Sequence, residues 1–306
     1  MLKCAIICQP IMAYVAGTLK SQLWTTLPYP TSDFSGQTVI VTGSNTGLGK
    51  EAARHIARLG ATRIVLAVRT ISKGEAAAAD IVASTGVPTS RILVWQLDMS
   101  DYRSIKGFSK RADALDRLDA VILNAGVMPF EWSETNGTET TMAINVVGTL
   151  LLTRRLYPTL QRSAKMTGQR SRLTIVGSGL MHTANYADFE TSGRILDKLK
   201  RQGNVPAGNY YKNSKLLVYY AARHIARLHP VSKDSDVLLT VHTPGICHSD
   251  IVRAEIGWAK SVGMRVAMGV LARTTEVGGR TLVHAVSPDL PIEAHGRFLV
   301  DCQIVE

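Results

Sequence analysis

The chain has 306 residues and a formal net charge of +11, with ordinary aromatic and charged fractions and no internal repeat or low-complexity tract. This length accommodates one large α/β domain or two smaller ones around a sizeable core. The basic balance favours an anionic cofactor, membrane or nucleic acid, but the basic residues are dispersed without a zinc-finger or RNA-binding signature, so we expect no nucleic-acid partner.

Residues 1–36 are expected to form an N-terminal arm that precedes a folded domain at residues 37–306. An apolar run extends from Cys4 to Ala16, but Pro10 interrupts it and it is shorter than the roughly 20 residues of a spanning helix. No good signal-peptide cleavage site follows it. We expect the arm to pack its apolar side on the domain, with contact to a membrane surface as the alternative.

The cysteines and histidines form no metal or disulfide pattern. Cys4, Cys8, Cys247 and Cys302 contain no Cys-x-x-Cys pair, which favours reduced thiols in a cytoplasmic protein. The other candidates, His182, His242 and His248, lack metal-ligand spacing with each other. No metal site is expected.

From Gln37 onward, apolar and β-branched runs alternate with segments of helical apolar spacing. The predicted strands are 38–42, 63–68, 92–97, 120–123, 173–176, 237–241 and 298–300, and the predicted helices are 48–59, 71–82, 138–160 and 211–228. This order predicts the α/β class, with a single doubly wound, Rossmann-type parallel sheet of about seven strands and helices on both faces. Two stretches of poor periodicity, 181–209 and 246–273, are expected to elaborate one edge.

A glycine-rich turn joins the first predicted strand to the first predicted helix. Its spacing is Gly43-x-x-x-Gly47-x-Gly49. Gly43 lets the chain leave the strand sharply, Gly47 admits close approach of a ligand, and Gly49 lets the helix pack on the sheet. The helix N-terminus then directs N–H groups and a positive dipole end at a pyrophosphate. We expect dinucleotide binding by Gly43, Ser44, Asn45, Thr46, Gly47, Leu48 and Gly49.

The end of the second predicted strand indicates which dinucleotide binds. An acidic residue there would accept from a ribose 2′-hydroxyl, but this place holds Val68, followed by Arg69 and Lys73. A guanidinium suits a 2′-phosphate, so the sequence favours NADP(H) over NAD(H). The alternative is that Arg69 and Lys73 are only surface charges of a basic protein.

Tyr211 and Lys215 lie four residues apart on a predicted helix, so a phenol and an ammonium point the same way. Tyr210 is the rival tyrosine, but only Tyr211 has a lysine four residues on. Lowering a phenol pKa from about 10 to near 7 requires roughly 4 kcal/mol. An ammonium about 4 Å away, helped by an oxidised nicotinamide, supplies energy on that order. The pair therefore predicts proton exchange with a carbonyl or alcohol oxygen.

Together these motifs resemble the short-chain dehydrogenase/reductase family, of the classical or retinol-dehydrogenase-like type, over about residues 36–302. The resemblance implies catalytic roles for Ser178, Tyr211, Lys215 and Asn145. It implies further cofactor contacts by Arg69, Lys73, Asp98, Asn124, Gly126, Tyr211, Lys215, Pro244, Gly245 and Ser249. The segments 244–249 and 271–278 are especially similar to filamentous-fungal members, many of which act in secondary metabolism.

The chemistry of these residues agrees with the implied roles. Ser178 would donate to the substrate oxygen and Tyr211 would supply its proton. Lys215 would hold the cofactor ribose, and Asn145 would bind a water that feeds protons to Lys215. Gly177-Ser178 replaces the usual paired serines, so the assignment of Ser178 rests on strand alignment.

We therefore expect NADPH-dependent, reversible reduction of a ketone or aldehyde, on an apolar secondary metabolite. The alternatives are oxidation of a lipid-like alcohol, as in retinol or steroid dehydrogenases, and a non-redox cofactor-binding protein such as a cyclisation template. Met264 and Met268 are candidates to line an apolar pocket. A homodimer or tetramer is expected through the long helices, at Leu150, Leu151, Leu152, Val218, Tyr219 and Tyr220.

Overall fold

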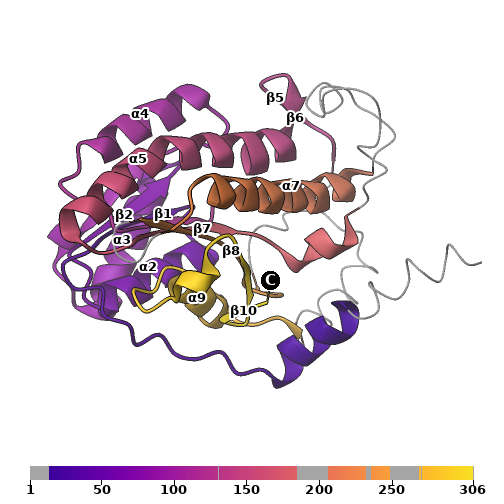
Figure 1. Cartoon of the computed structure of the whole chain (residues 1–306), viewed down its shortest axis with the longest axis horizontal. Helices are drawn as coiled ribbons and strands as arrows, with labels where there is room; N and C mark the ends of the chain where they lie inside the picture. The colour runs from indigo at the N-terminus through magenta and orange to yellow at the C-terminus, as the bar shows by residue number, and fades with distance from the viewer. Residues whose placement is uncertain are drawn as a thin grey trace, which may run out of the picture.

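The computed structural model describes residues 14–129, 131–184, 206–231, 236–248, 269 and 271–305. Its main sheet has eight strands in the order β10-β9-β8-β7-β4-β1-β2-β3 (Figure 1). The strands are β1 (Thr38–Thr42), β2 (Arg63–Val68), β3 (Ile92–Gln96), β4 (Ala120–Leu123), β7 (Ser171–Val176), β8 (Val237–Thr243), β9 (Phe298–Val300) and β10 (Gln303–Ile304). All neighbours pair in parallel except β9 and β10. The predicted doubly wound class is confirmed, with a short antiparallel edge strand added.

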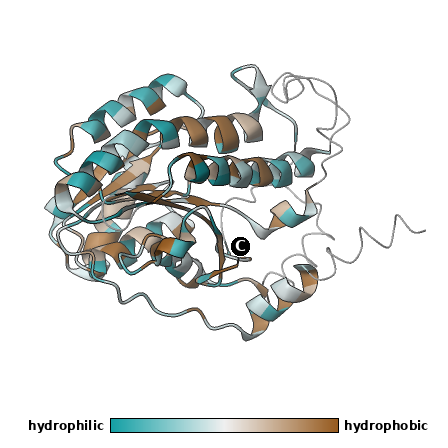
Figure 2. Ribbon diagram, in the orientation of Figure 1, coloured by the Kyte–Doolittle hydropathy of each residue, from teal (hydrophilic) through white to brown (hydrophobic). Residues whose placement is uncertain are grey.

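Helices cover both faces of the sheet, as Figure 1 shows. The helices of one face are α4 (Tyr102–Asp113), α5 (Thr149–Thr167) and α7 (Ala207–Leu228), and those of the other are α2 (Gly47–Arg58), α3 (Ile71–Thr85) and α9 (Thr275–His284). Alternate residues of β1 enter the two cores, Ile40 on the α5 side and Val41 on the α2 side. The strands are correspondingly the most uniformly apolar part of the ribbon in Figure 2.

The strand order reverses between β1 and β4, which pair in parallel with Val41 beside Ile122. β2 follows one way from β1, and β7 follows the other way from β4. Open α/β sheets bind ligands outside the carboxyl ends of their strands at such a reversal. The fold therefore directs attention to the residues that follow Thr42 and Leu123.

The predicted helix at 138–160 is wrong at its start. Residues 134–139 form a hairpin of β5 (Glu134–Thr135) and β6 (Thr138–Glu139), and a π-helical segment η2 (Met142–Gly148) leads into α5. The hairpin turn is Asn136-Gly137, both with positive φ, 54° and 72°. Asn-Gly is the preferred pair for a two-residue hairpin turn, so this signal was present in the sequence. α4, α9 and three short 3-10 helices, η1 (Thr89–Arg91), η3 (Gly179–Thr183) and η5 (Ile292–Ala294), were not predicted.

The described part of the N-terminal arm is a helix at residues 14–24 followed by an extended segment. The inward side of the helix carries Tyr14, Thr18, Ser21 and Gln22, which are partly buried, while apolar residues such as Leu19 are exposed. The apolar run at residues 4–16 lies mostly outside the described residues, so the expectation that its apolar side packs on the domain stays a prediction. Phe34 of the extended segment is fully buried. The boundary at residue 36 stays a prediction.

Half of the residues proposed for dimerisation lie inside the subunit. Leu152, Val218 and Tyr219 are buried in the core, so they are wrong as interface residues. Tyr220 is 43% exposed. Helices α5 and α7 use Leu152, Val218 and Tyr219 to pack in the core of the subunit. A homo-oligomer stays a prediction.

Candidate active site

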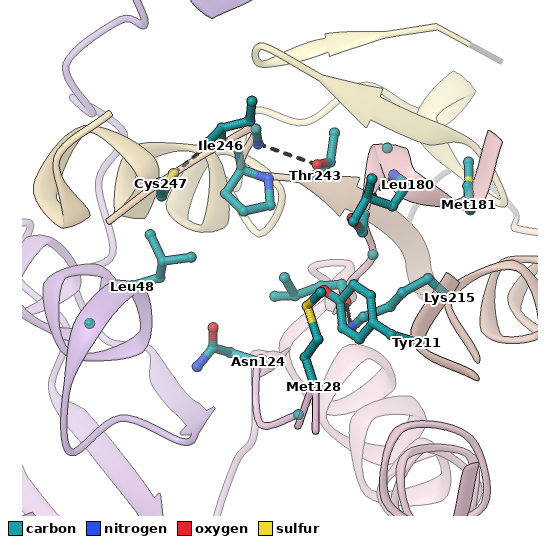
Figure 3. A pocket seen from close by; sticks show the side chains of 18 of the residues that line it. Leu48, Asn124, Met128, Leu180, Met181, Tyr211, Lys215, Thr243, Ile246 and Cys247 are labelled. Carbon is teal, nitrogen blue, oxygen red and sulfur yellow. Dashed lines mark hydrogen bonds between the residues drawn. The ribbon is translucent and has the colours of Figure 1, made fainter. Parts of the chain in front are cut away.

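A cavity of about 1590 Å³ opens at the carboxyl ends of β1, β4 and β7. Pockets for one drug-sized ligand are typically 300–1,000 Å³, so this cavity has room for a dinucleotide and a second molecule. Figure 3 shows Leu48 and Asn124 on one side of it and Tyr211 with Lys215 on the other.

The glycine turn forms one end of the cavity. Gly43 and Gly47 have φ of 64° and 58°, which only glycine adopts without strain. A Cβ on Gly47 would meet nothing within 4 Å, so the backbone there is open to a ligand. No acidic residue lies in the first turn of α2 to repel a phosphate. The turn fits a diphosphate, as predicted from the sequence.

Gly49 has a packing role that agrees with its prediction. A Cβ on it would lie 2.6 Å from Asn124 Nδ2 and 2.7 Å from the Gly43 carbonyl oxygen. The absence of a side chain thus lets α2 begin directly against the ends of β1 and β4. Among the turn residues, Ser44 is buried with its hydroxyl donating to the Val41 carbonyl at 2.8 Å. Its side chain points into the core, and the predicted contact of Ser44 with a cofactor stays a prediction.

The Asn124-Ala125-Gly126 element ties the ends of two strands together. Asn124 Nδ2 donates to the carbonyl oxygens of Thr42 at 3.0 Å and Gly43 at 3.2 Å. The Thr42 hydroxyl in turn accepts from the backbone N–H groups of Asn124 and Ala125. Asn124 and Gly126 both line the cavity. The element therefore holds the cavity floor in place and leaves Gly126 facing the interior.

The residues predicted to select the cofactor lie together on the cavity wall after β2 and β3. Arg69 and Lys73 are exposed, and both line the cavity with Asp98. Asp98 Oδ1 accepts from the Ser100 backbone N–H at 2.8 Å and from its hydroxyl at 2.6 Å. This wall of the cavity therefore carries two exposed cations, Arg69 and Lys73, and one carboxylate, Asp98, that hydrogen bonds hold in place.

Tyr211 lies near the start of α7, is 7% exposed, and lines the cavity. The hydroxyl of Ser178, which follows β7, lies near enough to the phenol to lower its pKa, and Ser178 lines the same cavity. Burial has the larger effect and raises the pKa of Tyr211 to about 12. The sequence-based expectation of a pKa near 7 included the charge of an oxidised nicotinamide, so it stays a prediction for the protein with that cofactor bound.

Lys215 follows Tyr211 by one helical turn and is 6% exposed. Its Nζ lies 5.5 Å from the centre of the Tyr211 ring and donates to the Val176 carbonyl at 2.7 Å. Burial lowers the pKa of Lys215 to about 8. The phenol and ammonium share one pocket as predicted, but a backbone carbonyl rather than the phenol holds the ammonium.

Asn145 lies in the π-helical segment η2 and is buried. Its Oδ1 accepts from the Val127 N–H and its Nδ2 donates to the Val127 carbonyl, both at 2.9 Å. Nδ2 also donates to the Ser214 hydroxyl at 3.2 Å. The side chain thus joins the cavity floor to α7, and its role in a proton relay stays a prediction.

The last predicted cofactor segment follows β8. Pro244 and Gly245 line the cavity, and Cys247 forms a parallel bridge with Arg273. Burial raises the pKa of the Cys247 thiol to about 12, so the thiol is neutral. Ser249, Met264 and Met268 lie outside the described residues. Within the described ranges, no three His, Cys, Asp or Glu side chains gather as metal ligands.

Several cavity residues were missed from the sequence. Met128, Leu180 and Met181 lie around Tyr211 in Figure 3 and make this end of the cavity apolar. The only indication in the sequence was that Met128 follows Asn124-Ala125-Gly126 closely and that Leu180 and Met181 follow Ser178 closely. Tyr14 and Gln22 also line the cavity, and no sequence pattern connected the N-terminal arm with it.

Comparisons with known proteins agree with this geometry. A family model described as short chain dehydrogenase matches residues 37–187. The chain is 39% identical to the short chain dehydrogenase/reductase dmxR8 of Cryptosporiopsis sp., covering 94% of this chain and 88% of the relative. It is 37% identical to the short chain dehydrogenase atnD of Emericella nidulans, covering 95% and 92%.

Solved structures show the same fold. An alcohol dehydrogenase from the archaeon Thermococcus sibiricus, complexed with 5-hydroxy-NADP, superposes with a TM-score of 0.60 at 19% identity, covering 86% of this chain and 95% of that one. The oxidoreductase yciK from E. coli superposes with a TM-score of 0.64 at 21% identity, covering 89% and 98%.

Proposed function

The chain belongs to the short-chain dehydrogenase/reductase family and resembles its filamentous-fungal, secondary-metabolism members, and from this premise we propose that it reduces a ketone or aldehyde with NADPH. The observation that carries the proposal is that Ser178, Tyr211 and the buried Lys215 line one cavity, with the Lys215 ammonium 5.5 Å from the centre of the Tyr211 ring. These groups lie in one cavity with a turn that fits a diphosphate. A proton donor, an oxyanion partner and a nucleotide site are therefore together.

The reaction adds two atoms to the carbonyl group. When bound, NADPH supplies the hydride that bonds to the carbonyl carbon. Tyr211 gives its phenolic proton to the carbonyl oxygen, and the Ser178 hydroxyl donates a hydrogen bond to that oxygen as negative charge develops. Lys215 stabilises the phenolate that remains until a solvent proton restores it. The products are an alcohol and the oxidised nucleotide.

The raised pKa of Tyr211 supports the reductive direction. A phenol with a pKa of about 12 is protonated at neutral pH and ready to act as an acid. Oxidation of an alcohol, the alternative direction, needs the phenolate as a base. That form is costly in this buried site until another positive charge is near. In neutral solution the phenol is therefore in the protonated form that reduction requires.

NADPH is proposed as the cofactor because of charge. Arg69 and Lys73 line the cavity at the end of β2, where a carboxylate would repel a 2′-phosphate. Both side chains are exposed and can reach a ligand at this edge. A guanidinium and an ammonium are the usual protein partners of a phosphate. The Thermococcus sibiricus neighbour, complexed with 5-hydroxy-NADP, has the same fold.

An apolar substrate is proposed from the residues around Tyr211. Met128, Leu180 and Met181 line that end of the cavity, and methionine side chains adapt to irregular apolar shapes. A substrate bearing rings or a branched hydrocarbon would bury its surface against them. The reactive oxygen alone would meet the polar pair Ser178 and Tyr211.

The test measures turnover of a panel of carbonyl compounds by wild type and by variants of two neighbouring tyrosines. Wild-type protein with NADPH is mixed with aliphatic, aromatic and polycyclic ketones and aldehydes, and loss of the reduced-nicotinamide absorbance band is followed. Tyr211→Phe should lower turnover by about 10²–10⁴-fold without weakening NADPH binding. Tyr210→Phe is the control, because Tyr210 packs beside Met142 rather than in the cavity.

The outcomes separate the candidate functions. Turnover that survives Tyr211→Phe would contradict the assigned acid. Tight NADPH binding without reduction of any carbonyl would favour the alternative of a non-redox cofactor-binding protein.

We propose a cytoplasmic location. Cys247 and Cys302 are both free thiols, as expected in a reducing compartment. The helices of the described residues include none long and apolar enough to cross a membrane. Membrane-surface contact remains the alternative, since Val15, Leu19 and Leu23 are exposed along one side of the helix at residues 14–24. Co-sedimentation with anionic vesicles tests it.

A further inference from the structure

The helix at residues 14–24 lines the cavity mouth. Tyr14, Thr18, Ser21 and Gln22 recur at helical spacing and are its partly buried residues there, while the more exposed Val15 and Leu19 also line the cavity. Leu23 and Trp24 on other sides are 44% and 74% exposed. The helix is therefore oriented by its contacts with the cavity mouth, not by burial of its apolar side chains.

A buried arginine attaches this helix to the loop after β8. Arg273 is 8% exposed, and its Nη2 donates to the Ser21 carbonyl at 2.8 Å and to the Ser21 hydroxyl at 3.2 Å. Its Nη1 donates to Asp301 Oδ1 at 2.7 Å and to the Pro244 carbonyl at 3.5 Å. One guanidinium thus joins the N-terminal helix, the loop at Pro244 and the turn after β9.

Gln22 makes a second attachment to the same loop. With its amide oriented to satisfy its neighbours, the nitrogen donates to the carbonyls of Ile246 at 3.0 Å and Leu271 at 2.9 Å. Its side chain also lies over Gly245, where a Cβ would clash with the Gln22 amide group. The helix position is therefore determined by hydrogen bonds from two sides.

This position brings Tyr14 to the reacting end of the cavity. The Tyr14 ring packs on Gly179, since a Cβ there would lie 2.7 Å from the Tyr14 hydroxyl and 2.9 Å from a ring carbon. The ring also lies 5.5 Å from the imidazole of His182. Gly179 directly follows Ser178, and the Tyr14 phenol lies near enough to Tyr211 to influence its pKa. Burial raises the pKa of Tyr14 itself, so its phenol is a neutral surface.

We propose that the helix at residues 14–24 forms a wall of the substrate pocket and that Tyr14 is a specificity-determining residue, whose ring receives the apolar rings of the substrate beside Ser178 and Tyr211. This inference rests on the proposed reductase function. It adds a flat aromatic surface beside Gly179 and His182 at this end of the cavity. The substrate class it selects is a carbonyl compound with a planar ring system, because flat rings stack on a tyrosine face.

The experiment compares two carbonyl substrates of different shape with the full chain and saturating NADPH. Selectivity is the ratio of kcat/KM for a polycyclic aromatic ketone to kcat/KM for a small aliphatic aldehyde. Tyr14→Ala should lower this ratio about tenfold or more, chiefly by raising KM for the ring-bearing ketone. Tyr14→Phe keeps the ring and should leave the ratio near the wild-type value.

Two controls distinguish a role of the helix as a wall of the substrate pocket from a general disturbance of the structure. Trp24→Ala changes an exposed aromatic residue of the same helix and should leave the ratio unchanged. The dissociation constant of NADPH should be the same in all variants, which excludes a displaced Pro244 loop.

Three results would overturn the inference. An unchanged ratio in Tyr14→Ala, or an equal loss with both substrates, would contradict the role of Tyr14 while leaving the reductase function intact. An equal change in Trp24→Ala would show that the helix has no special inward side. A wild-type protein that reduces no carbonyl would overturn the proposed function and this inference together.

Discussion

The side-chain amide of Asn145 pairs with both backbone polar groups of Val127, accepting from its N–H and donating to its carbonyl at 2.9 Å each. This contact connects the π-helical start of α5 with the loop that follows β4. The bond from the same amide to the Ser214 hydroxyl extends the connection to the helix of Tyr211. The position of the proton donor relative to the cavity floor thus depends on one asparagine.

Asn145→Ala should lower both stability and turnover. It removes the partner of two backbone groups of Val127 and one of the bonds of the Ser214 hydroxyl, which still donates to the Tyr211 carbonyl. Each polar group left buried without a partner costs about 1–3 kcal/mol. Asn145→Asp keeps the acceptor for the Val127 N–H but loses both donors and buries a carboxylate, so it should be destabilised as well. Urea unfolding measures the free energy of unfolding of the three proteins. Equal stability of Asn145→Ala and wild type would contradict the structural role of this amide.

Gly49→Ala should destabilise the protein by about 1–3 kcal/mol and weaken NADPH binding. The added Cβ would lie 2.6 Å from Asn124 Nδ2 and 2.7 Å from a backbone oxygen, and backbone cannot move away cheaply. Gly107→Ala is the matched control, because Gly107 lies in α4 with nothing within 4 Å of a Cβ. That change should instead stabilise by about 0.5–1 kcal/mol. Thermal unfolding and NADPH titration check both variants, and a tolerated Gly49→Ala would contradict the packing described here.

Arg69→Ala should reduce the affinity for NADPH by about tenfold to a hundredfold and leave that for NADH nearly unchanged. A hydrogen bond to a charged group contributes about 1.5–3 kcal/mol, and only NADPH carries the 2′-phosphate that Arg69 would contact. Arg103→Ala on α4, whose side chain is 97% exposed, is the control. Fluorescence titration with both nucleotides gives the constants. An equal loss for NADH and NADPH would show that Arg69 does not read the phosphate.

The contribution of Lys215 to the free energy of unfolding should rise between about pH 8 and 10.5. Burial lowers the pKa of this ammonium from 10.5 to about 8 in the folded protein. In that interval Lys215 binds more protons in the unfolded chain than in the folded one, so raising the pH stabilises the fold through this residue. Burial raises the pKa of Cys247 and of Tyr211 to about 12, which lowers stability with pH over part of the same range, so the contribution of Lys215 is read as the difference between wild type and Lys215→Met. The penalty present below pH 8 is about 3 kcal/mol at most, from the separation of the two values.

Lys215→Met should remove this pH dependence and abolish turnover. The free energy of unfolding near pH 7 should change little or increase. The variant no longer buries a charged ammonium, which stabilises the fold, but it also loses the hydrogen bond to the Val176 carbonyl, which offsets part of that gain. Urea midpoints without cofactor across pH 7–10 measure the slope. A slope equal to that of wild type would contradict the burial of the charge.

Local pattern predicted the centre of the fold well. The bounds of β1, β2 and β4 agree with the strands predicted at 38–42, 63–68 and 120–123, because a strand buried on both faces is a continuous apolar run. α4 was missed although its signals were present. Asp101 accepts from the Arg103 N–H as a cap, and Ile105, Phe108 and Ala112 are buried at helical spacing. The charged residues between these positions made the apolar spacing hard to recognise in the sequence.

The candidate site was predictable only where the chemistry follows from short spacing. Tyr211 and Lys215 meet because four residues make one helical turn, and Gly43 and Gly47 carry the positive φ expected of the turn. The pKa of Tyr211 was not predictable, since desolvation depends on every element packed around the phenol. Tyr14 was not predictable either, because its contact with Gly179 joins segments 165 positions apart through hydrogen bonds made by other residues.

We expect Tyr211 to deliver the proton while NADPH reduces a carbonyl in this cavity, and a single-turnover experiment tests this expectation. The protein is saturated with NADPH, and a substrate from the panel is added in excess by rapid mixing. Loss of the reduced-nicotinamide band is recorded for wild type, Tyr211→Phe and Tyr210→Phe. Wild type and Tyr210→Phe should oxidise all bound NADPH in one fast phase, and Tyr211→Phe should show a phase at least about 10²-fold slower. Equal rates in all three proteins would contradict it.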